Sequence, residues 1–338
     1  MESKETILKL RPRSLRLACL LAITLVIALG WTLYQCAEIR VEREARDNLM
    51  FIDRMKGDQL NIWHRQRLSD IAFIVRNPVN DHHIAPLLSG LAKEEDREAT
   101  LEWMGAILKD SFYRSVVLAD TRGQARLAVG PADMNLTADD QSNIVQVVRS
   151  GKSLFDTIHS ADNIGRLHTS LYVPVMRQHT PECLGVMMLE IDPADFLFPL
   201  LRNWPWHSHS GETELIQSDG RDAIIIKTQA HGTGSFAPLH ISLAESNQLS
   251  VIAASGHTGL VDLVDYRGVE VLAALRPVPD APWHLVSKID RAEVLAPLRR
   301  DALIITGGIL VLLTLVGLLF LYHRLILVRL NFRYKAFA

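Results

Sequence analysis

The sequence predicts an α+β protein in which two membrane-spanning helices flank a long helix and two tandem antiparallel sheets. Three observations support this fold class. Two uncharged apolar blocks lie near the ends of the 338-residue chain, a charged segment with helical spacing follows the first block, and one strand-to-helix phrase occurs twice. The formal charge of −2 shows no basic excess, so the composition gives no indication of nucleic-acid binding.

The two apolar blocks, Leu17–Leu33 and Ala302–Tyr322, contain no charged residue. Each approaches the roughly 20 residues that cross a bilayer. Lysines and arginines precede the first block and follow the second, and such residues mark the cytoplasmic side of a membrane. A cleaved signal peptide is the alternative interpretation of the first block. We predict a cytoplasmic tail (1–14), a first span (15–36), a second span (300–323) and a cytoplasmic stub (324–338).

The segment after the first span, residues 37–110, is predicted to be a long juxtamembrane helix followed by a helical region. Apolar residues between Leu49 and Val75 recur mostly three or four positions apart, which is helical spacing. From Glu38 to Val75 such a helix would be about 55 Å long. Asn77-Pro78 ends it, because proline disfavours helix in the preceding residue. A solvated stalk and a dimer seam are the two interpretations of this helix.

A first sheet module is predicted over residues 111–205. Its hairpin is marked by a Gly-containing turn at 120–123, and its later strands show alternating apolar and polar residues. Cys183 is the only cysteine outside the first apolar block and its edge, so no intrachain disulfide is expected there. The predicted elements are the hairpin strands Tyr113–Ala119 and Gln124–Val129, a helix at Ala138–Arg149, and strands at Ser153–His159, Arg166–Val175 and Leu184–Ile191.

A second sheet module is predicted over residues 206–298. Turns with glycine at 218–220 and 265–268 separate its strands, and residues 230–254 fit no single pattern. The predicted strands are Glu212–Gln217, Asp222–Lys227, Leu260–Val264, Val269–Leu275 and Trp283–Ile289.

The repeated phrase links the two modules. Ile191-Asp192-Pro193 and Ile289-Asp290-Arg291 each follow a predicted strand and lie 98 positions apart. In each copy an acid follows the aspartate three residues later, a variant of the capping box, so the aspartate is expected at a helix N-cap. A Pro-Val pair precedes each copy, at Pro174 and Pro277, 103 positions apart. The order of elements therefore indicates two copies of one small domain, the second of which runs into a membrane span.

The whole pattern resembles the double Cache family. The residues that carry the resemblance are Tyr266-Arg267-Gly268-Val269, Arg276-Pro277-Val278, Pro282-Trp283-His284-Leu285-Val286 and Ile289-Asp290, together with the two spans and the long helix. The resemblance covers about residues 15–323. It implies two tandem PAS-like modules, the periplasmic sensor of a bacterial inner-membrane sensor kinase, diguanylate cyclase or chemoreceptor. It also implies a small ligand on the membrane-distal module and a proximal module that connects to the second span. Amino-acid-binding members carry an Arg-x-Trp-Tyr-like element after the first hairpin, whereas Gly130–Ser150 contains neither Trp nor Tyr, which argues against an amino-acid ligand.

The candidate ligand-binding residues are polar and aromatic side chains expected on the concave side of the first sheet. Arg114 can pair with a carboxylate in bidentate fashion, and Asp192 with an amine. The alternatives are that the strand residues form a solvated sheet face and that Asp192 only caps a helix. The full set is Trp103, Tyr113, Arg114, His168, Ser170, Tyr172 and Asp192. The candidate signal-relay residues are Asp290, Glu293 and Pro297, where proline is expected to bend the helix.

No catalytic residue, cofactor or metal site is predicted. The chain contains no phosphate-binding glycine loop with Lys-Ser/Thr, no Gly-x-Ser-x-Gly and no His-Glu-x-x-His. About 15 residues follow the second span, so we expect either the sensory part of a longer protein, such as a sensor histidine kinase, or a chain that works with a cytoplasmic signalling partner. A solute receptor, expected to be a homodimer, is the first functional hypothesis. A membrane-tethered interaction or assembly module without a small ligand is the second.

Overall fold

The computed structural model describes residues 12–109, 113–131, 134–160, 167–227, 238–244, 248–279 and 281–336. Contacts divide the chain into two compact units. One comprises residues 46–290; the other combines the two terminal segments, up to residue 45 and from residue 291. The cytoplasmic tail predicted for 1–14 falls almost wholly outside the described residues.

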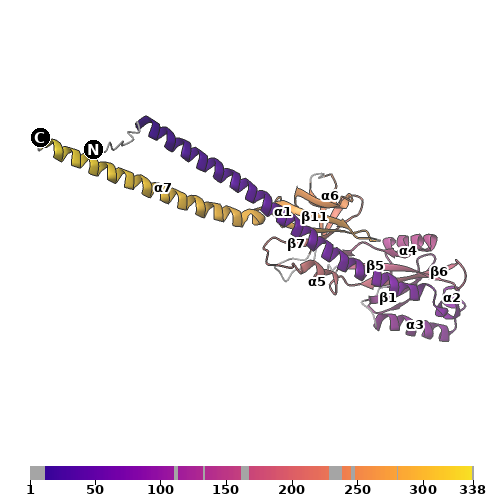
Figure 1. The fold of residues 1–338 in the computed structure, drawn as a ribbon. Coiled ribbons are helices and arrows are strands. Elements are labelled where there is room, and N and C mark those ends of the chain that lie inside the picture. The colour runs from indigo at the N-terminus through magenta and orange to yellow at the C-terminus, as the bar shows by residue number, and fades with distance from the viewer. Residues whose placement is uncertain are drawn as a thin grey trace. The chain divides into compact units, whose positions relative to one another are not determined.

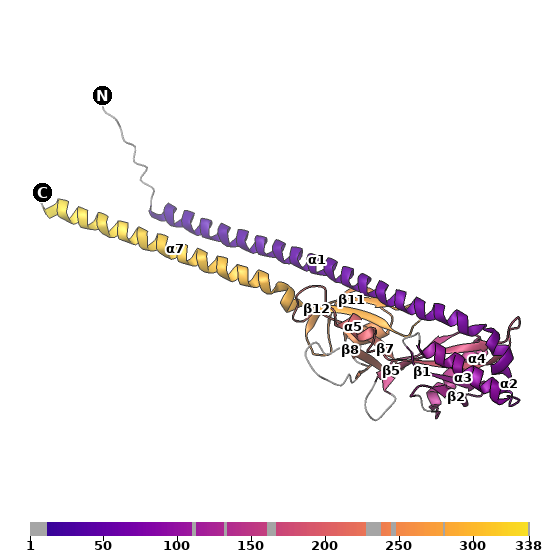
Figure 2. The same ribbon diagram turned by 90° about the horizontal axis from the view of Figure 1, so that it is seen from below.

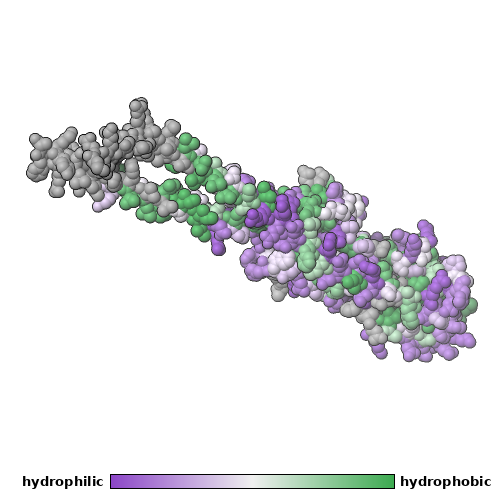
Figure 3. Space-filling view, viewed as in Figure 1, coloured by the Kyte–Doolittle hydropathy of each residue, from purple (hydrophilic) through white to green (hydrophobic). Residues whose placement is uncertain are grey.

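The terminal unit consists of the first part of helix α1 (Pro12–Val75) and helix α7 (Arg291–Ala336). Among the described residues, one helix is long and apolar enough to cross a membrane, the Arg291–Leu319 part of α7, and its most apolar stretch has no buried residue. From Leu303 onward the described side chains of this part are mostly hydrophobic and exposed (Figure 3). No such segment is found in the described part of α1, and an arrangement with two spans stays a prediction.

Helix α7 begins directly after the last strand and continues without a break through Pro297. The guanidinium of Arg291, its first residue, donates to Oε1 of Glu42 from both Nε (2.9 Å) and Nη2 (2.7 Å). The prediction that the second copy of the phrase enters a helix continuous with the apolar block is therefore confirmed.

The first sheet has the strand order β2-β1-β6-β5-β3, with β4 also paired to β5, and all of its pairs are antiparallel. Helices α3 and α4 lie on opposite sides of it (Figure 1). One predicted strand, Ser153–His159, is interrupted at 156–158 and forms two short strands, both paired to β5. The elements are α3 (Glu94–Lys109), β1 (Tyr113–Asp120), β2 (Ala125–Val129), α4 (Ala138–Ser150), β3 (Leu154–Phe155), β4 (His159–Ser160), β5 (Leu167–Met176) and β6 (Cys183–Ile191).

The second sheet has the order β10-β11-β12-β7-β8-β9 and is also antiparallel throughout. The segment that fitted no single pattern, 230–254, supplies a strand and a short helix, apart from its residues 230–237 and 245–247, which lie outside the described chain. The elements are β7 (Glu212–Ser218), β8 (Asp222–Lys227), β9 (Leu239–Ser242), α6 (Leu249–Ala254), β10 (Gly259–Val264), β11 (Glu270–Pro277) and β12 (His284–Asp290).

The pairing register aligns the two copies of the repeat. Glu190 and Lys288, 98 positions apart, each lie on the central strand of three. Both sheets therefore have the same topology around the central strand, and each residue of one sheet can be compared with the residue at the same position in the other. Glu190 pairs with Ser115 on one side and Ser170 on the other. Lys288 pairs with Glu212, at the position of Ser115, and with Ala273, at the position of Ser170.

The second half of α1 packs against both sheets. Its apolar residues Leu60 and Trp63 belong to one buried cluster that includes side chains of the first and the second sheet. In that cluster the rings of Phe155 and Trp283, one from each module, meet edge to face at 5.2 Å. Figure 2 shows α1 running past the second sheet towards α2 (Ala85–Leu88) and α3. The apolar stripe read from the sequence is thus a core contact, and this half of α1 is not a solvated stalk.

The first copy of the phrase differs from its prediction. Asp192 does not cap a helix; its Oδ1 accepts the N–H of Ala194 (2.9 Å) in a turn, and helix α5 (Leu197–Arg202) begins five residues later. Phe196 lies outside the helical region at φ −126°, and its ring stacks on Trp63 at 5.2 Å. The stack against α1 fixes Phe196 and delays the start of the helix. A short π-helical turn, η1 (Asn80–Ile84), precedes α2 in the region that was predicted to be helical.

Candidate functional site

Polar side chains gather on the side of the first sheet that α4 covers, which we call the α4 face. On β5, His168, Ser170 and Tyr172 point to this side, while Leu171 and Val173 enter the core shared with α1. This confirms the alternation predicted for the strand. Tyr172 and Ser170 are almost completely buried, so the α4 face is not an ordinary solvated sheet surface.

The corresponding face of the second sheet, covered by α6, is apolar on the same strand. In the register, Ala273 takes the place of Ser170, and Leu275 takes that of Tyr172. Both are buried in a hydrophobic cluster with residues of α6. Because the scaffold is the same, the polar residues of the first sheet are not required by the fold. Burying polar groups costs free energy unless they find partners, which points to a role other than packing.

Two acids converge on the phenol of Tyr172. Its hydroxyl donates to Oδ1 of Asp140 at 2.6 Å and lies 3.4 Å from Oδ2 of Asp156. Burial and the charge of Asp140 raise the pKa of the Tyr172 phenol, which therefore remains a neutral donor. Asp140 is positioned by a capping box at the start of α4, where its carboxylate and the Thr137 hydroxyl exchange hydrogen bonds with each other's backbone N–H groups.

A second acidic pair lies at the end of β6. Oε2 of Glu190 accepts from the Ser115 hydroxyl at 2.5 Å. The guanidinium of Arg114 approaches both Glu190 (4.0 Å) and Asp192 (3.9 Å), distances too long for direct hydrogen bonds. All three charged side chains are partly exposed. Arg114 therefore retains donors that a ligand carboxylate can use, and the two acids can receive a cation.

Two histidines complete the α4 face. The rings of His159 and His168 meet edge to face at 4.3 Å, and these residues pair across β4 and β5. Burial, and secondarily the positive charge of a protonated His159, lowers the pKa of His168. His168 is therefore neutral at pH 7, and its ring can donate or accept a hydrogen bond.

The structure brings five of the seven predicted ligand residues to the α4 face or its edge and separates the other two. Tyr113 is buried in the core that contains α1, and Trp103 on α3 packs against that same core. Sequence reasoning did not select five residues that complete the α4 face. Asp140 was detectable, since Thr137-x-x-Asp140 is a capping-box pattern; the others gave no local signal. The residues not selected are Ser115, Asp140, Asp156, His159 and Glu190.

The predicted relay residues lie on both sides of the junction between β12 and α7. Asp290 is the last residue of β12, and its Oδ1 is 2.5 Å from Nη2 of Arg267. Glu293 is in the first turn of α7, and Pro297 lies exposed within the helix, which nevertheless remains continuous.

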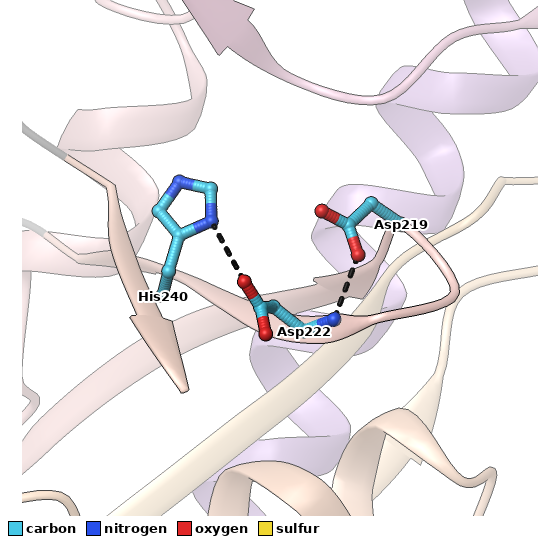
Figure 4. Close-up of side chains that lie close together, drawn as sticks. All are labelled: Asp219, Asp222 and His240. Carbon is cyan, nitrogen blue, oxygen red and sulfur yellow. Dashed lines mark hydrogen bonds and ion pairs between the residues drawn. The ribbon is translucent and has the colours of Figure 1, made fainter. Parts of the chain in front are cut away.

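Among the described residues, one group of three side chains has a spacing that could hold a metal ion: Asp219, Asp222 and His240 (Figure 4). Oδ1 of Asp219 already accepts the N–H groups of Arg221 (2.8 Å) and Asp222 (2.7 Å). Nδ1 of His240 is 3.7 Å from Oδ2 of Asp222. These contacts account for the group as a turn with an exposed ion pair.

Comparison with known proteins identifies the fold. No protein-family model matches the chain, and no curated protein sequence matches it. Among solved structures, the ligand-binding domain of the Pseudomonas aeruginosa PAO1 amino acid chemoreceptor PctB, in complex with L-Arg, aligns at a TM-score of 0.51 and 15% identity, covering 76% of this chain and 92% of that one. The extracellular domain of mmHK1S-Z2, described as a histidine kinase, aligns at 0.51 and 14%, covering 75% and 99%. The ligand-binding domain of the P. aeruginosa chemoreceptor PctC, in complex with GABA, aligns at 0.50 and 14%, covering 73% and 100%. The tandem sheets on one long helix therefore have the fold of chemoreceptor and histidine-kinase ligand-binding domains, as the resemblance to double Cache sensors implied.

Proposed function

We propose that this chain is the sensory part of a bacterial inner-membrane receptor, and that the α4 face of its first sheet binds a small solute that carries an ammonium group. One observation carries the proposal: β5 carries the buried polar residues Ser170 and Tyr172 on the α4 face, where the matching positions of β11 in the second sheet are the apolar Ala273 and Leu275. Such a difference between copies of one scaffold is expected where one copy binds a solute and the other does not.

The charges on the α4 face favour a cationic group. Among the described residues, the guanidinium of Arg114 is the one that approaches the carboxylates at the edge of the α4 face, and the acids there are Asp140, Asp156, Glu190 and Asp192. Carboxylates hold ammonium groups through charge-assisted hydrogen bonds. Arg114 lies beside the acids and suits the carboxylate of a zwitterion. L-Arg and GABA, bound by two proteins of the same fold, both carry an ammonium and a carboxylate group. The absence of Trp and Tyr from Gly130–Ser150 argued against an amino-acid ligand; this proposal replaces that expectation and assigns the carboxylate contact to Arg114 instead.

A thermal-unfolding screen of the full chain in detergent tests this proposal. A solute at about 100 times its Kd stabilises a protein by roughly 2.7 kcal/mol, which raises Tm by about 5–10 °C for a unit of this size. We expect such shifts from amines and amino acids and not from dicarboxylates. The second functional hypothesis, an interaction module without a ligand, predicts no shift with any solute and a protein partner that co-purifies.

Two glutamate variants locate the site. Glu190→Gln removes a charge from the α4 face, and we expect the Kd for the ammonium solute to rise at least tenfold by calorimetry. Glu102→Gln is the matched control, because Glu102 is exposed on α3. Equal affinities of the two variants would contradict the assignment of the site.

A homodimer through α1 is part of the proposal. The exposed face of this helix carries Phe51, Ile62 and Phe73, each more than half exposed and spaced eleven residues apart. An eleven-residue repeat keeps side chains on one stripe of a helix over many turns, which suits a second copy of the same helix. We expect Ile62→Cys to form disulfide-linked dimers upon mild oxidation. Glu98→Cys, exposed on α3, is the control, and equal cross-linking at both sites would refute the interface.

The signalling route in this proposal runs through α7. The helix follows β12 without a loop and carries the apolar segment that can cross a membrane. In this proposal the sheets are periplasmic, both ends of the chain are cytoplasmic, and α7 passes a small displacement to a histidine kinase or cyclase domain. That domain belongs either to a longer parent protein or to a partner, and we expect no catalytic activity from this chain alone.

A further inference from the structure

The second sheet contains a buried cation held by acids. The side chain of Lys288 has no exposed surface, and its Nζ lies 2.9 Å from Oε1 of Glu212, 3.0 Å from Oε1 of Glu214 and 2.9 Å from Oδ2 of Asp265. The ring of Tyr266 lies 4.3 Å from the same nitrogen. Three carboxylates and an aromatic face are the surroundings that proteins use to bind an alkylammonium ligand.

The position of this cation in the fold corresponds to the candidate ligand site. Lys288 occupies the place that Glu190 has in the first sheet, and Glu212 the place of Ser115. Both sites lie at the same end of the central strand, on the face covered by the module's own helix. In the first sheet the central residue is an acid; in the second sheet it is a cation surrounded by acids.

Lys288 is permanently charged. Burial alone would lower the pKa of its ammonium group, but the charges of Glu214 and Glu212 and the hydrogen bond to Asp265 raise that pKa above its ordinary value. Asp265 remains ionised, because its contact with Lys288 outweighs burial and lowers the pKa of the carboxyl group.

The same acids connect the cation to the end of the sheet. Oδ2 of Asp265 also accepts from Nε of Arg267 at 2.7 Å, and Arg267 reaches Asp290, the last residue before α7. The turn between β10 and β11 is thereby fastened to the end of β12. These ion pairs connect the centre of the sheet to Asp290, the residue directly before α7.

We propose that Lys288 acts as a tethered ligand: its ammonium group permanently fills, in the second sheet, the position at which the first sheet binds a solute. This inference rests on the proposed function for its comparison with the first sheet. The second module is then an occupied copy that does not respond to solutes, and its filled site holds the end of β12 rigid for transmission to α7.

The test is chemical rescue of Lys288→Ala in the full chain. This substitution removes three carbons and the ammonium, which n-propylammonium replaces atom for atom. Breaking a buried ion pair in this way should lower Tm by roughly 10 °C. After unfolding and refolding in about 50 mM n-propylammonium chloride, we expect at least half of that loss to be recovered, with no recovery in 1-propanol or in sodium chloride at matched concentrations.

Lys56→Ala is the matched control. Lys56 is also fully buried, but its ammonium donates to neutral oxygens, the Leu201 carbonyl (3.0 Å) and the Thr213 hydroxyl (2.8 Å), and we expect at most a slight response to the amine. If Lys288→Ala does not fold alone, the folded yield with and without the amine replaces Tm as the readout. The inference is overturned if Lys288→Ala recovers the same Tm or folded yield in propylammonium and in propanol. It is also overturned if the amine rescues Lys288→Ala and Lys56→Ala equally. Neither result depends on a solute binding to the first sheet, so the proposed function is tested separately.

Discussion

Gln217 is the side chain whose replacement most directly tests how the two sheets are joined. It lies on β7 and is almost completely buried. Its Oε1 accepts the backbone N–H of Ile158 at 2.9 Å, and its Nε2 donates to the carbonyl of the same residue at 2.6 Å. Ile158 lies between Asp156 and His159, two residues of the α4 face. A residue of the second sheet therefore holds a segment of the candidate site.

Gln217→Met keeps most of the side-chain volume and removes both hydrogen bonds. Two buried backbone groups then lose their partners, at about 1–3 kcal/mol for each, so we expect the free energy of unfolding to fall by about 2–6 kcal/mol. Urea titration of the full chain, followed by tryptophan fluorescence, measures this loss, since Trp63 and Trp283 lie in the shared core. Amide exchange at Ile158 should become faster.

The control for this change is Gln141→Met, at an exposed glutamine on α4. Surface substitutions of this kind usually change stability by less than about 0.5 kcal/mol. If Gln217→Met and Gln141→Met lost the same small amount, the double hydrogen bond would contribute nothing measurable. The idea that it fixes the 156–159 segment would then be refuted.

Two further predictions concern the β1–β2 turn and helix α7. Asp120 closes the β1–β2 turn, and although burial opposes it, hydrogen bonds from Gln124 and Arg126 lower the pKa of this carboxyl group. A depressed folded-state pKa stabilises the fold above the unfolded value near 3.9, and this contribution disappears as pH falls through the folded pKa. Asp120→Asn should therefore lose about 1 kcal/mol at pH 7 and show a shallower loss of Tm between pH 5 and 2; an unchanged slope would contradict the assignment. Pro297→Ala restores a backbone bond in α7, and in a fusion of the chain to a reporter kinase it should change output without changing solute Kd; parallel changes in both would count against α7 as the relay.

The sequence was sufficient for the order of the elements, because periodicity and turn residues are local signals. Val269–Leu275, predicted after a Gly-containing turn, corresponds to β11 within two residues at either end. The duplication was also visible, and its offsets of 98 and 103 match the register of the paired strands. Where the prediction differed, a distant contact was responsible: Trp63, from α1, stacks on Phe196 and delays α5.

The candidate site was only partly predictable, because side chains on one face of a sheet come from strands far apart in sequence. Alternation along β5 placed Ser170 and Tyr172 together. It contained no information on Asp140, which arrives from α4, or on Glu190, which arrives from β6. Tyr113 was chosen for its chemistry, but a register shift between Tyr113 and Ser115 puts its side chain in the core that contains α1.

The arrangement of charges gives the duplicated sheets separate tasks. Among the described residues of the first sheet, the acids around Tyr172 and Glu190 have few cationic partners, so the binding of a cationic solute there can be strongly favourable. In the second sheet, the ammonium group of Lys288 already contacts three carboxylates, so a solute cation has less to gain there. A ligand can shift a conformational equilibrium only through its differential affinity for the two states. The proposed solute site therefore lies in the first sheet, and in this proposal the second sheet passes the displacement on, since its last strand continues directly into α7.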